Sequence, residues 1–196
     1  MSILYILLSL LLWGLVHSLL ASLSFKSFLA KSLGMLLMRG YRLFYNLFSL
    51  VSFLPVLYLV ATLPDAPLYS VPAPISYLML LGQGVGAVLL LVGVLQTDTL
   101  YFVGLRQFFE QEQPAKFVTN GLYRLVRHPL YTAGLLFLWL SPQVTVNSFT
   151  LYVAATIYIL IGAYFEERKL LREFGAAYAE YKTKTPMLIP GLKFRN

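Results

Sequence analysis

Two arginines, a histidine and a proline are crowded into GLYRLVRHPLY, residues 121–131. Proline suits the first turn of a helix and disfavours helical geometry in the residue before it, so we expect a helix to begin at Pro129. The first N–H groups of that helix, with Arg124 and Arg127, would attract a carboxylate or a phosphate. The alternative is that these cations hold the end of a membrane helix at the lipid headgroups, a common role of arginine at such ends.

A pair of carboxylates, Glu166 and Glu167, follows the last long apolar run of the chain. Negative charge is unfavourable at the C-terminal end of a helix, and it is costly at a lipid boundary unless it has partners. We therefore expect a cationic partner. It is either Arg124 or Arg127 in a structural salt bridge, or a bound cationic group, and the sequence leaves both interpretations open.

Four polar residues in or beside apolar runs are candidates for substrate contacts. An ionisable residue inside a membrane helix is a functional candidate, although a histidine that bonds a neighbouring helix is the more common case. A metal site is not expected, because the chain has no cysteine and only two histidines, far apart in sequence. The four candidates are His17, Asn46, Asp98 and Gln107.

Three glycines, Gly82, Gly84 and Gly86, alternate within one apolar run. No strand precedes them, so they indicate close helix packing rather than a nucleotide-binding loop. That packing can occur within one chain or between chains, and the oligomeric state therefore stays open.

The elements that carry these residues are predicted to be membrane helices. Of the 196 residues, 59% are hydrophobic and 12% are charged, against about 25% charged in soluble domains. A helix needs about 20 apolar residues to span a bilayer. We predict one all-α domain, residues 1–196. The fourth span is short but, together with its polar approach, could cross obliquely, and a tight turn at 141–143 joins it to the fifth. The five predicted transmembrane helices are Ile3–Leu23, Leu43–Leu63, Ile75–Gln96, Leu130–Leu140 and Val144–Phe165.

The positive charges predict an orientation for these spans. All 15 lysines and arginines lie in three segments, 26–42, 106–127 and 168–195. Because cytoplasmic loops collect Lys and Arg, the N-terminus is expected outside and the C-terminus in the cytoplasm. The net charge of +7 is thereby explained by the membrane, and no nucleic-acid partner is expected. Residues 166–181 show helical apolar spacing, which predicts an amphipathic helix at the cytoplasmic interface, with Gly175 as a candidate break.

The motifs together resemble a known family. GLYRLVRHPLY and EERKLLREFGAAYAEYKTKTPMLIP resemble the C-terminal signature of the isoprenylcysteine carboxyl methyltransferase superfamily: R-H-P-x-Y, an E-E pair, F-G-x-x-Y-x-x-Y and a closing proline. HSLLASLSFK, FVGLRQ and SPQVTVNSFTLYVAATIYILIG are similar to the branch with bacterial methanethiol S-methyltransferases and NnrU-type membrane proteins. The resemblance implies S-adenosylmethionine-dependent methyl transfer at the cytoplasmic face of a bacterial inner membrane, with residues 97–196 as the cofactor-binding part.

The resemblance also implies roles for individual residues. Arg127, His128 and Glu167 would be catalytic, the glutamates would hold the amino-acid or ribose end of the cofactor, and residues 188–190 would cover the adenosine. The implied cofactor-binding residues are Arg124, His128, Pro129, Tyr131, Glu166, Glu167, Tyr178, Leu188 and Pro190.

The methyl acceptor is expected to be small or lipophilic: a thiol such as methanethiol, a carboxylate or a membrane lipid. A thiolate or carboxylate needs no strong base, whereas an amine or alcohol does. Two alternatives to methyl transfer stay open. One is an NnrU-like accessory membrane protein without catalysis. The other is an NADPH-dependent membrane reductase, since sterol reductases resemble the same superfamily.

Overall fold

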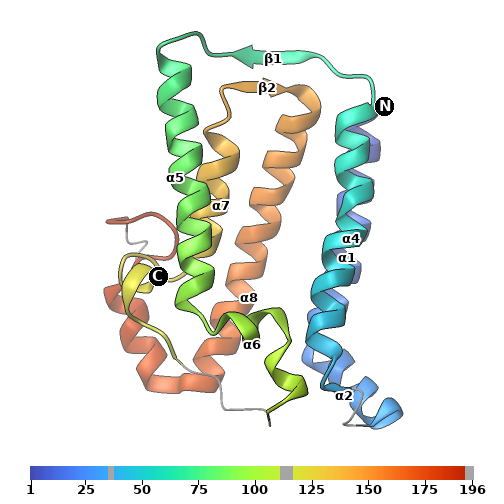
Figure 1. Cartoon of the computed structure of the whole chain (residues 1–196), viewed down its shortest axis with the longest axis vertical. Helices are drawn as coiled ribbons and strands as arrows, with labels where there is room; N and C mark the ends of the chain where they lie inside the picture. Colours follow the sequence, from blue (N-terminus) through green and yellow to red (C-terminus); the bar gives the residue numbers. More distant parts are fainter. Residues whose placement is uncertain (35–37, 111–116, 193–196) are drawn as a thin grey trace. The chain divides into compact units, whose positions relative to one another are not determined.

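The computed structural model describes residues 1–34, 38–110 and 117–192, and within these ranges the chain is largely helical, as predicted (Figure 1). Lys116, Lys193 and Arg195, three of the cations used to predict the orientation, lie outside the described residues. The elements are α1 (Ser2–Ala21), α2 (Leu23–Leu33), α4 (Tyr41–Thr62), β1 (Pro67–Ser70), α5 (Ile75–Gln96), α6 (Thr99–Val103), the 3-10 turns η1 (Arg106–Phe108) and η2 (Gly121–Arg124), α7 (Pro129–Trp139), β2 (Gln143–Thr145) and α8 (Val146–Lys184).

Four of these helices, α1, α4, α5 and α8, are long and apolar enough to cross a membrane. Most of their large apolar side chains are exposed, which is unfavourable in water but suits contact with lipid. The chain is therefore an integral membrane protein. The eleven residues of α7 extend only about 16 Å along a helix axis, roughly half of a bilayer's hydrocarbon core. The fifth span, the orientation and the interfacial placement of the tail remain predictions.

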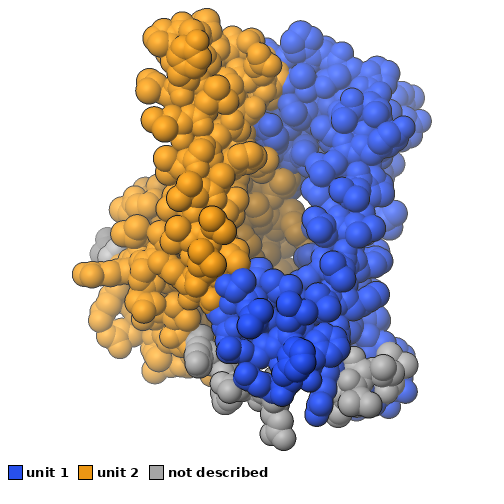
Figure 2. All heavy atoms as spheres, in the orientation of Figure 1, with its two compact units in different colours: residues 1–68, 98–114, 145–154 blue, residues 69–97, 115–144, 155–196 orange. Residues whose placement is uncertain are grey.

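The chain divides into two compact units, coloured separately in Figure 2. The first contains residues 1–68, 98–114 and 145–154, and the second contains 69–97, 115–144 and 155–196. In the first unit α1 packs against α4, and polar side chains join them. His17 Nδ1 lies 3.0 Å from Ser49 Oγ and its Nε2 lies 2.7 Å from the Tyr45 hydroxyl. This histidine thus bonds a neighbouring helix, the more common of the two cases considered from the sequence.

The second unit is organised by the contact between α5 and α7, which lie side by side in Figure 1. A Cβ atom added at Gly86 would lie 3.1 Å from the Ala133 carbonyl oxygen and 3.2 Å from the Phe137 nitrogen. Gln83 Nε2 donates to the Phe137 carbonyl at 2.8 Å. A Cβ at Gly84 would meet no heavy atom within 4 Å. Gly86 therefore permits backbone approach within one chain, and Gly84 faces open space.

Substituting Gly86 with valine should separate α5 from α7, because the new side chain would overlap backbone atoms that cannot rotate away. Overpacking of this kind costs on the order of 2 kcal/mol. Thermal unfolding of the detergent-solubilised chain should show a clearly lower melting temperature for Gly86→Val, while the matched Gly84→Val should melt within a degree or two of the parent. Equal effects at both positions would contradict the assignment of Gly86 to the helix contact.

The connection between α7 and α8 differs from the predicted turn at 141–143. It extends to Thr145 and includes β2, which pairs with β1 in a two-stranded sheet. The helix then begins at Val146 rather than Val144, because Thr145 and Ser148 bond reciprocally: each backbone N–H donates to the hydroxyl of the other. Val144 and Thr145 are β-branched and favour the extended conformation, so the chain stays extended up to this cap.

Candidate functional site

The start of α7 is bound by the C-terminal end of the chain. Pro129 is the first helical residue and His128 precedes it in a non-helical conformation, as predicted. Four successive carbonyl oxygens, of residues 185–188, accept hydrogen bonds from this region, and we call residues 185–188 the strap. The donors are Arg127 Nη1 to Thr185 at 2.5 Å, Arg127 N to Pro186 at 2.9 Å, His128 N to Met187 at 3.1 Å and Thr132 Oγ1 to Leu188 at 2.7 Å.

A buried ion pair lies at the centre of the site. Arg127 Nε donates to Glu167 Oε1 at 2.6 Å, and the two side chains are 8% and 9% exposed. Arg127 Nη1 also donates to the Lys182 carbonyl at 3.2 Å, and Lys182 Nζ lies 3.3 Å from Glu167 Oε2. Arg127 is therefore the cationic partner that the carboxylate pair was expected to have. Its guanidinium bonds the protein's own acceptors, so it holds α7, α8 and the strap together.

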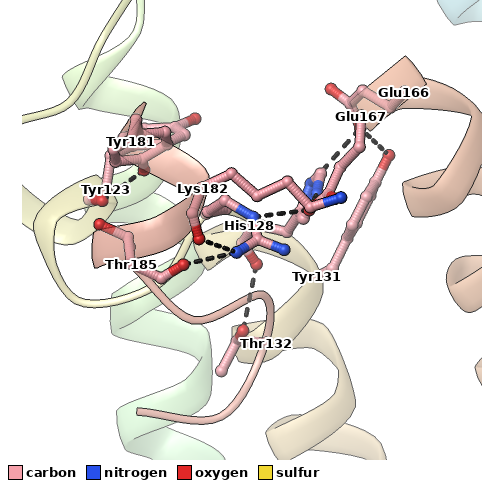
Figure 3. A network of polar contacts seen from close by, with 10 residues as sticks. Tyr123, His128, Tyr131, Thr132, Glu166, Glu167, Tyr181, Lys182 and Thr185 are labelled. Carbon is pink, nitrogen blue, oxygen red and sulfur yellow. Dashed lines mark hydrogen bonds and ion pairs between the residues drawn. The ribbon is translucent and has the colours of Figure 1, made fainter. Parts of the chain in front are cut away.

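His128 lies between the two carboxylates, as Figure 3 shows. Its Nε2 is 3.3 Å from Glu167 Oε1, and its Nδ1 is at an ion-pair distance of 3.6 Å from Glu166 Oε2. The ring of Tyr131 stacks on the imidazole with centroids 5.3 Å apart, and its hydroxyl donates to Glu166 Oε2 at 2.9 Å. Glu166 is 45% exposed and is the carboxylate of the pair that a ligand can reach.

The network is held in its charged form. Burial raises the pKa of Glu167, but hydrogen bonds from His128 and Arg127 outweigh burial and lower that pKa to about 2. Burial lowers the pKa of His128, but the hydrogen bonds and negative charges of Glu166 and Glu167 outweigh it and raise that pKa above the ordinary value. At neutral pH the site thus contains charged groups of both signs in close contact.

The tail returns to this network through a break in α8. Gly175 has φ +53°, a left-handed backbone conformation that favours glycine. Beyond it, Tyr178 and Tyr181 pack with Phe117, whose ring also stacks on Phe174 at a centroid distance of 5.0 Å. Tyr181 donates to the Tyr123 carbonyl at 2.5 Å. Tyr178 is 1% exposed, and its hydroxyl has no hydrogen-bond partner among the described residues.

The structure thus brings most of the predicted site residues into one unit. Five of them are in direct contact: Arg127, His128, Tyr131, Glu166 and Glu167. Pro129 starts the helix that follows His128, and the Leu188 carbonyl accepts a hydrogen bond from Thr132. Arg124 and Pro190 are exposed, and the Arg124 side chain makes no ion pair within the described part of the chain. Sequence reasoning did not single out three residues that complete the network: Thr132, Lys182 and Thr185.

The four substrate candidates lie in the other unit and have partners of their own. Asn46 Nδ2 donates to the carbonyls of Phe102 and Val103, at the C-terminal end of α6. Asp98 caps the start of the same helix and forms an ion pair with Arg106. Gln107 Nε2 donates to the Tyr101 carbonyl, while its buried Oε1 has no partner among the described residues. With His17 bonded between α1 and α4, all four have structural roles, and substrate contact stays a prediction.

Comparison with known proteins supports the resemblance seen in the sequence. The sequence model of the NnrU protein family matches residues 5–139 of this chain. Methanethiol S-methyltransferase 2 of Bradyrhizobium diazoefficiens is 32% identical over 186 residues, covering 92% of this chain and 70% of the relative. Methanethiol S-methyltransferases of Pseudomonas deceptionensis and Crocosphaera subtropica are 36% and 38% identical over 62% and 54% of this chain, which spans 47% and 43% of those relatives. No solved structure matches. This chain belongs to the NnrU family.

Proposed function

We propose that this protein is an S-adenosylmethionine-dependent methyltransferase of a bacterial inner membrane, with the site at the cytoplasmic face. The relatives named methanethiol S-methyltransferase support methyl transfer. The observation that carries the proposal is the contact network that joins the R-H-P segment, the E-E pair and the tail within one compact unit. The acceptor is a thiol such as methanethiol in the first instance, and a carboxylate or lipid acceptor is the alternative.

The residues at the site fit the chemistry of this cofactor. Glu166 is an exposed carboxylate suited to an ammonium group, and Arg124 is an exposed guanidinium suited to a carboxylate. The Tyr178 hydroxyl is buried and has no hydrogen-bond partner among the described residues, whereas buried polar groups usually have one. Bound there, the cofactor would supply an electrophilic methyl group on a sulfonium sulfur. We assign Glu166, Tyr178 and residues 188–190 to holding it.

Arg127 and Glu167 act differently in this proposal. They are buried and bonded to each other, so they are positioning residues that fix His128, Glu166 and the strap. A rigid arrangement of this kind is what methyl transfer requires from a protein, because in-line displacement depends mainly on the alignment of acceptor, methyl group and leaving sulfur. Five spans with the N-terminus outside would place this network at the cytoplasmic surface, since the Lys and Arg segments flank it.

Calorimetry with S-adenosylhomocysteine in detergent tests the proposal. We expect binding by the parent chain and an affinity lower by roughly 10-fold or more in Glu166→Ala, because a charge-assisted hydrogen bond contributes about 1.5–3 kcal/mol. Glu173→Ala is the matched control, since Glu173 is an exposed carboxylate on the same helix, and it should bind like the parent.

Transfer of radiolabelled methyl groups to methanethiol then tests the reaction itself. Cofactor binding without transfer to any thiol, carboxylate or lipid would favour a non-catalytic accessory protein. Binding of NADPH with no heat from S-adenosylhomocysteine would favour a reductase instead.

A further inference from the structure

His128 is the only titratable ring whose two nitrogens face the carboxylates of the candidate site among the described residues, and what its protons imply for the acceptor rests on the proposed function. Both ring nitrogens of His128 face carboxylate oxygens, Nε2 toward Glu167 and Nδ1 toward Glu166. An ionised carboxylate only accepts hydrogen bonds. A neutral imidazole would therefore direct a bare nitrogen lone pair at one of two negatively charged groups, whereas the doubly protonated ring donates to Glu167 at 3.3 Å and forms an ion pair with Glu166 at 3.6 Å.

The other histidine of the chain provides an internal comparison. His17 has its two ring nitrogens beside hydroxyls, those of Ser49 and Tyr45. A hydroxyl donates as readily as it accepts, so a neutral ring with one protonated nitrogen satisfies that environment. The two histidines are thus expected to differ in protonation because of the chemistry of their partners.

The charged groups around His128 act in opposite directions, since the two carboxylates favour the imidazolium and the nearby cations disfavour it. Glu166 and Glu167 face it from α8, Arg127 precedes it, and Lys182 pairs with Glu167 from the part of α8 beyond Gly175. Among the described residues the cations at the site, which include the imidazolium and Lys169 near Glu166, outnumber the two carboxylates, so the site carries net positive charge. Tyr131, the stacked neighbour, donates its hydroxyl to Oε2 of Glu166.

We propose that His128 is a positioning residue held as an imidazolium, and that the site methylates an acceptor that arrives as a thiolate rather than one that needs a general base. An imidazolium has no lone pair with which to take a proton. Glu167 is a poor base because its pKa is about 2. Fixed positive charge lowers the pKa of a nearby thiol, which favours the anionic acceptor without any proton transfer to the protein.

The bonds and protons balance in this scheme. The acceptor thiol loses its proton to solvent before the transfer. An electron pair of its sulfur forms the new bond to the methyl carbon, and the bond from that carbon to the sulfonium sulfur breaks with its pair remaining on the latter sulfur. His128 keeps both protons throughout and holds Glu166 and Glu167 in place.

Nitrogen NMR of the full chain in detergent tests the protonation state without any cofactor. Labelling only histidine with ¹⁵N gives signals from two residues, and His17→Gln removes one set and assigns the other. At pH 6.5, the ordinary pKa of histidine, we expect both nitrogens of His128 to carry protons in most molecules, and a titration midpoint that falls in Glu166→Gln, since an opposite charge is removed. Glu166 is exposed, so this variant should fold even if Glu167→Gln does not. One bare His128 nitrogen in most molecules at pH 6.5 would overturn the proposal.

A series of thiols tests the consequence for the acceptor. The pH dependence of kcat/KM should follow the pKa of each thiol and move with it from one acceptor to the next, and amines should not be methylated. A midpoint that stays at one pH for every thiol, or efficient methylation of amines, would show a protein base and overturn this part. If no acceptor is methylated at any pH, the proposed function fails and the acceptor conclusion with it, while the NMR result still decides the state of His128.

Discussion

Glu167→Ala is expected to be one of the most destabilising single substitutions in this protein. The change leaves the guanidinium of Arg127 buried without its counter-charge, and Lys182 also loses its partner. Removing one member of a buried ion pair typically costs about 3–5 kcal/mol, because the remaining charge is not solvated. For a chain of this size that corresponds to a melting temperature lower by roughly 10 °C, measured by thermal unfolding in detergent.

Two comparisons separate this effect from a general sensitivity of the site. Glu166→Ala removes the neighbouring carboxylate, which is 45% exposed, and should lower the melting temperature much less. The double substitution Arg127→Met with Glu167→Met should recover part of the loss, since replacing both members of a buried pair by apolar groups is often close to neutral. If Glu166→Ala and Glu167→Ala have the same effect, the buried pair does not have the central role that we assign to it.

The same network predicts how stability depends on pH. The pKa of Glu167 is lowered to about 2, so its contribution is present above its ordinary pKa of about 4.3 and is lost as the pH falls toward 2. The pKa of His128 is raised, so its contribution is present below about 6.5 and is lost as the pH rises through the raised value. The melting temperature should therefore decline on both sides. His128→Gln should flatten the alkaline side and also weaken the acid side, because the hydrogen bond from His128 helps to lower the pKa of Glu167.

Much of the site could be predicted because charges in unfavourable places require partners. Two carboxylates at the end of an apolar run indicate a cation nearby, and Arg127, two residues before Pro129, supplies it. The start of the helix at Pro129 could also be predicted, because proline restricts the backbone conformation of both itself and the preceding residue. The sequence did not distinguish the two glutamates. Adjacent residues point about 100° apart on a helix, so only one faces inward, and packing decides that it is Glu167.

The contacts of the strap could not be predicted from the sequence, for a different reason. Three of its hydrogen-bond donors belong to Arg127 and His128, but all four acceptors are backbone carbonyls, which every residue possesses. Lys182 and Thr185 reach the site only because the chain turns at Gly175, and the direction after such a break depends on φ and ψ rather than on residue type. The bonding of His17 to α4 was likewise one of two possibilities until the facing helix was known.

Deleting residues 186–196 is expected to abolish binding of S-adenosylhomocysteine, with an affinity at least 100-fold lower, while the apolar helices still insert into the membrane. The truncation removes the carbonyls that accept from the backbone of Arg127 and His128 and from the hydroxyl of Thr132. Each buried donor left without a partner costs about 1–3 kcal/mol, and His128 and Glu166 lose their fixed positions with it. Calorimetry on the truncated chain measures the loss, and a shorter deletion of residues 193–196, which keeps the strap, is the control.

Thr132→Val refines this test, because it deletes one strap hydrogen bond and nearly preserves the shape of the side chain. We expect a several-fold weaker affinity and little change in the melting temperature, consistent with a bond that is worth about 1 kcal/mol. Thr183→Val is the matched control, since within the described part of the chain the Thr183 hydroxyl donates to the Glu180 carbonyl on the exposed part of α8. If the truncated chain melts earlier but binds S-adenosylhomocysteine like the parent, the strap stabilises α7 without shaping the ligand site. If it neither melts earlier nor binds less tightly, the carbonyls of residues 186–188 are not what satisfies Arg127 and His128.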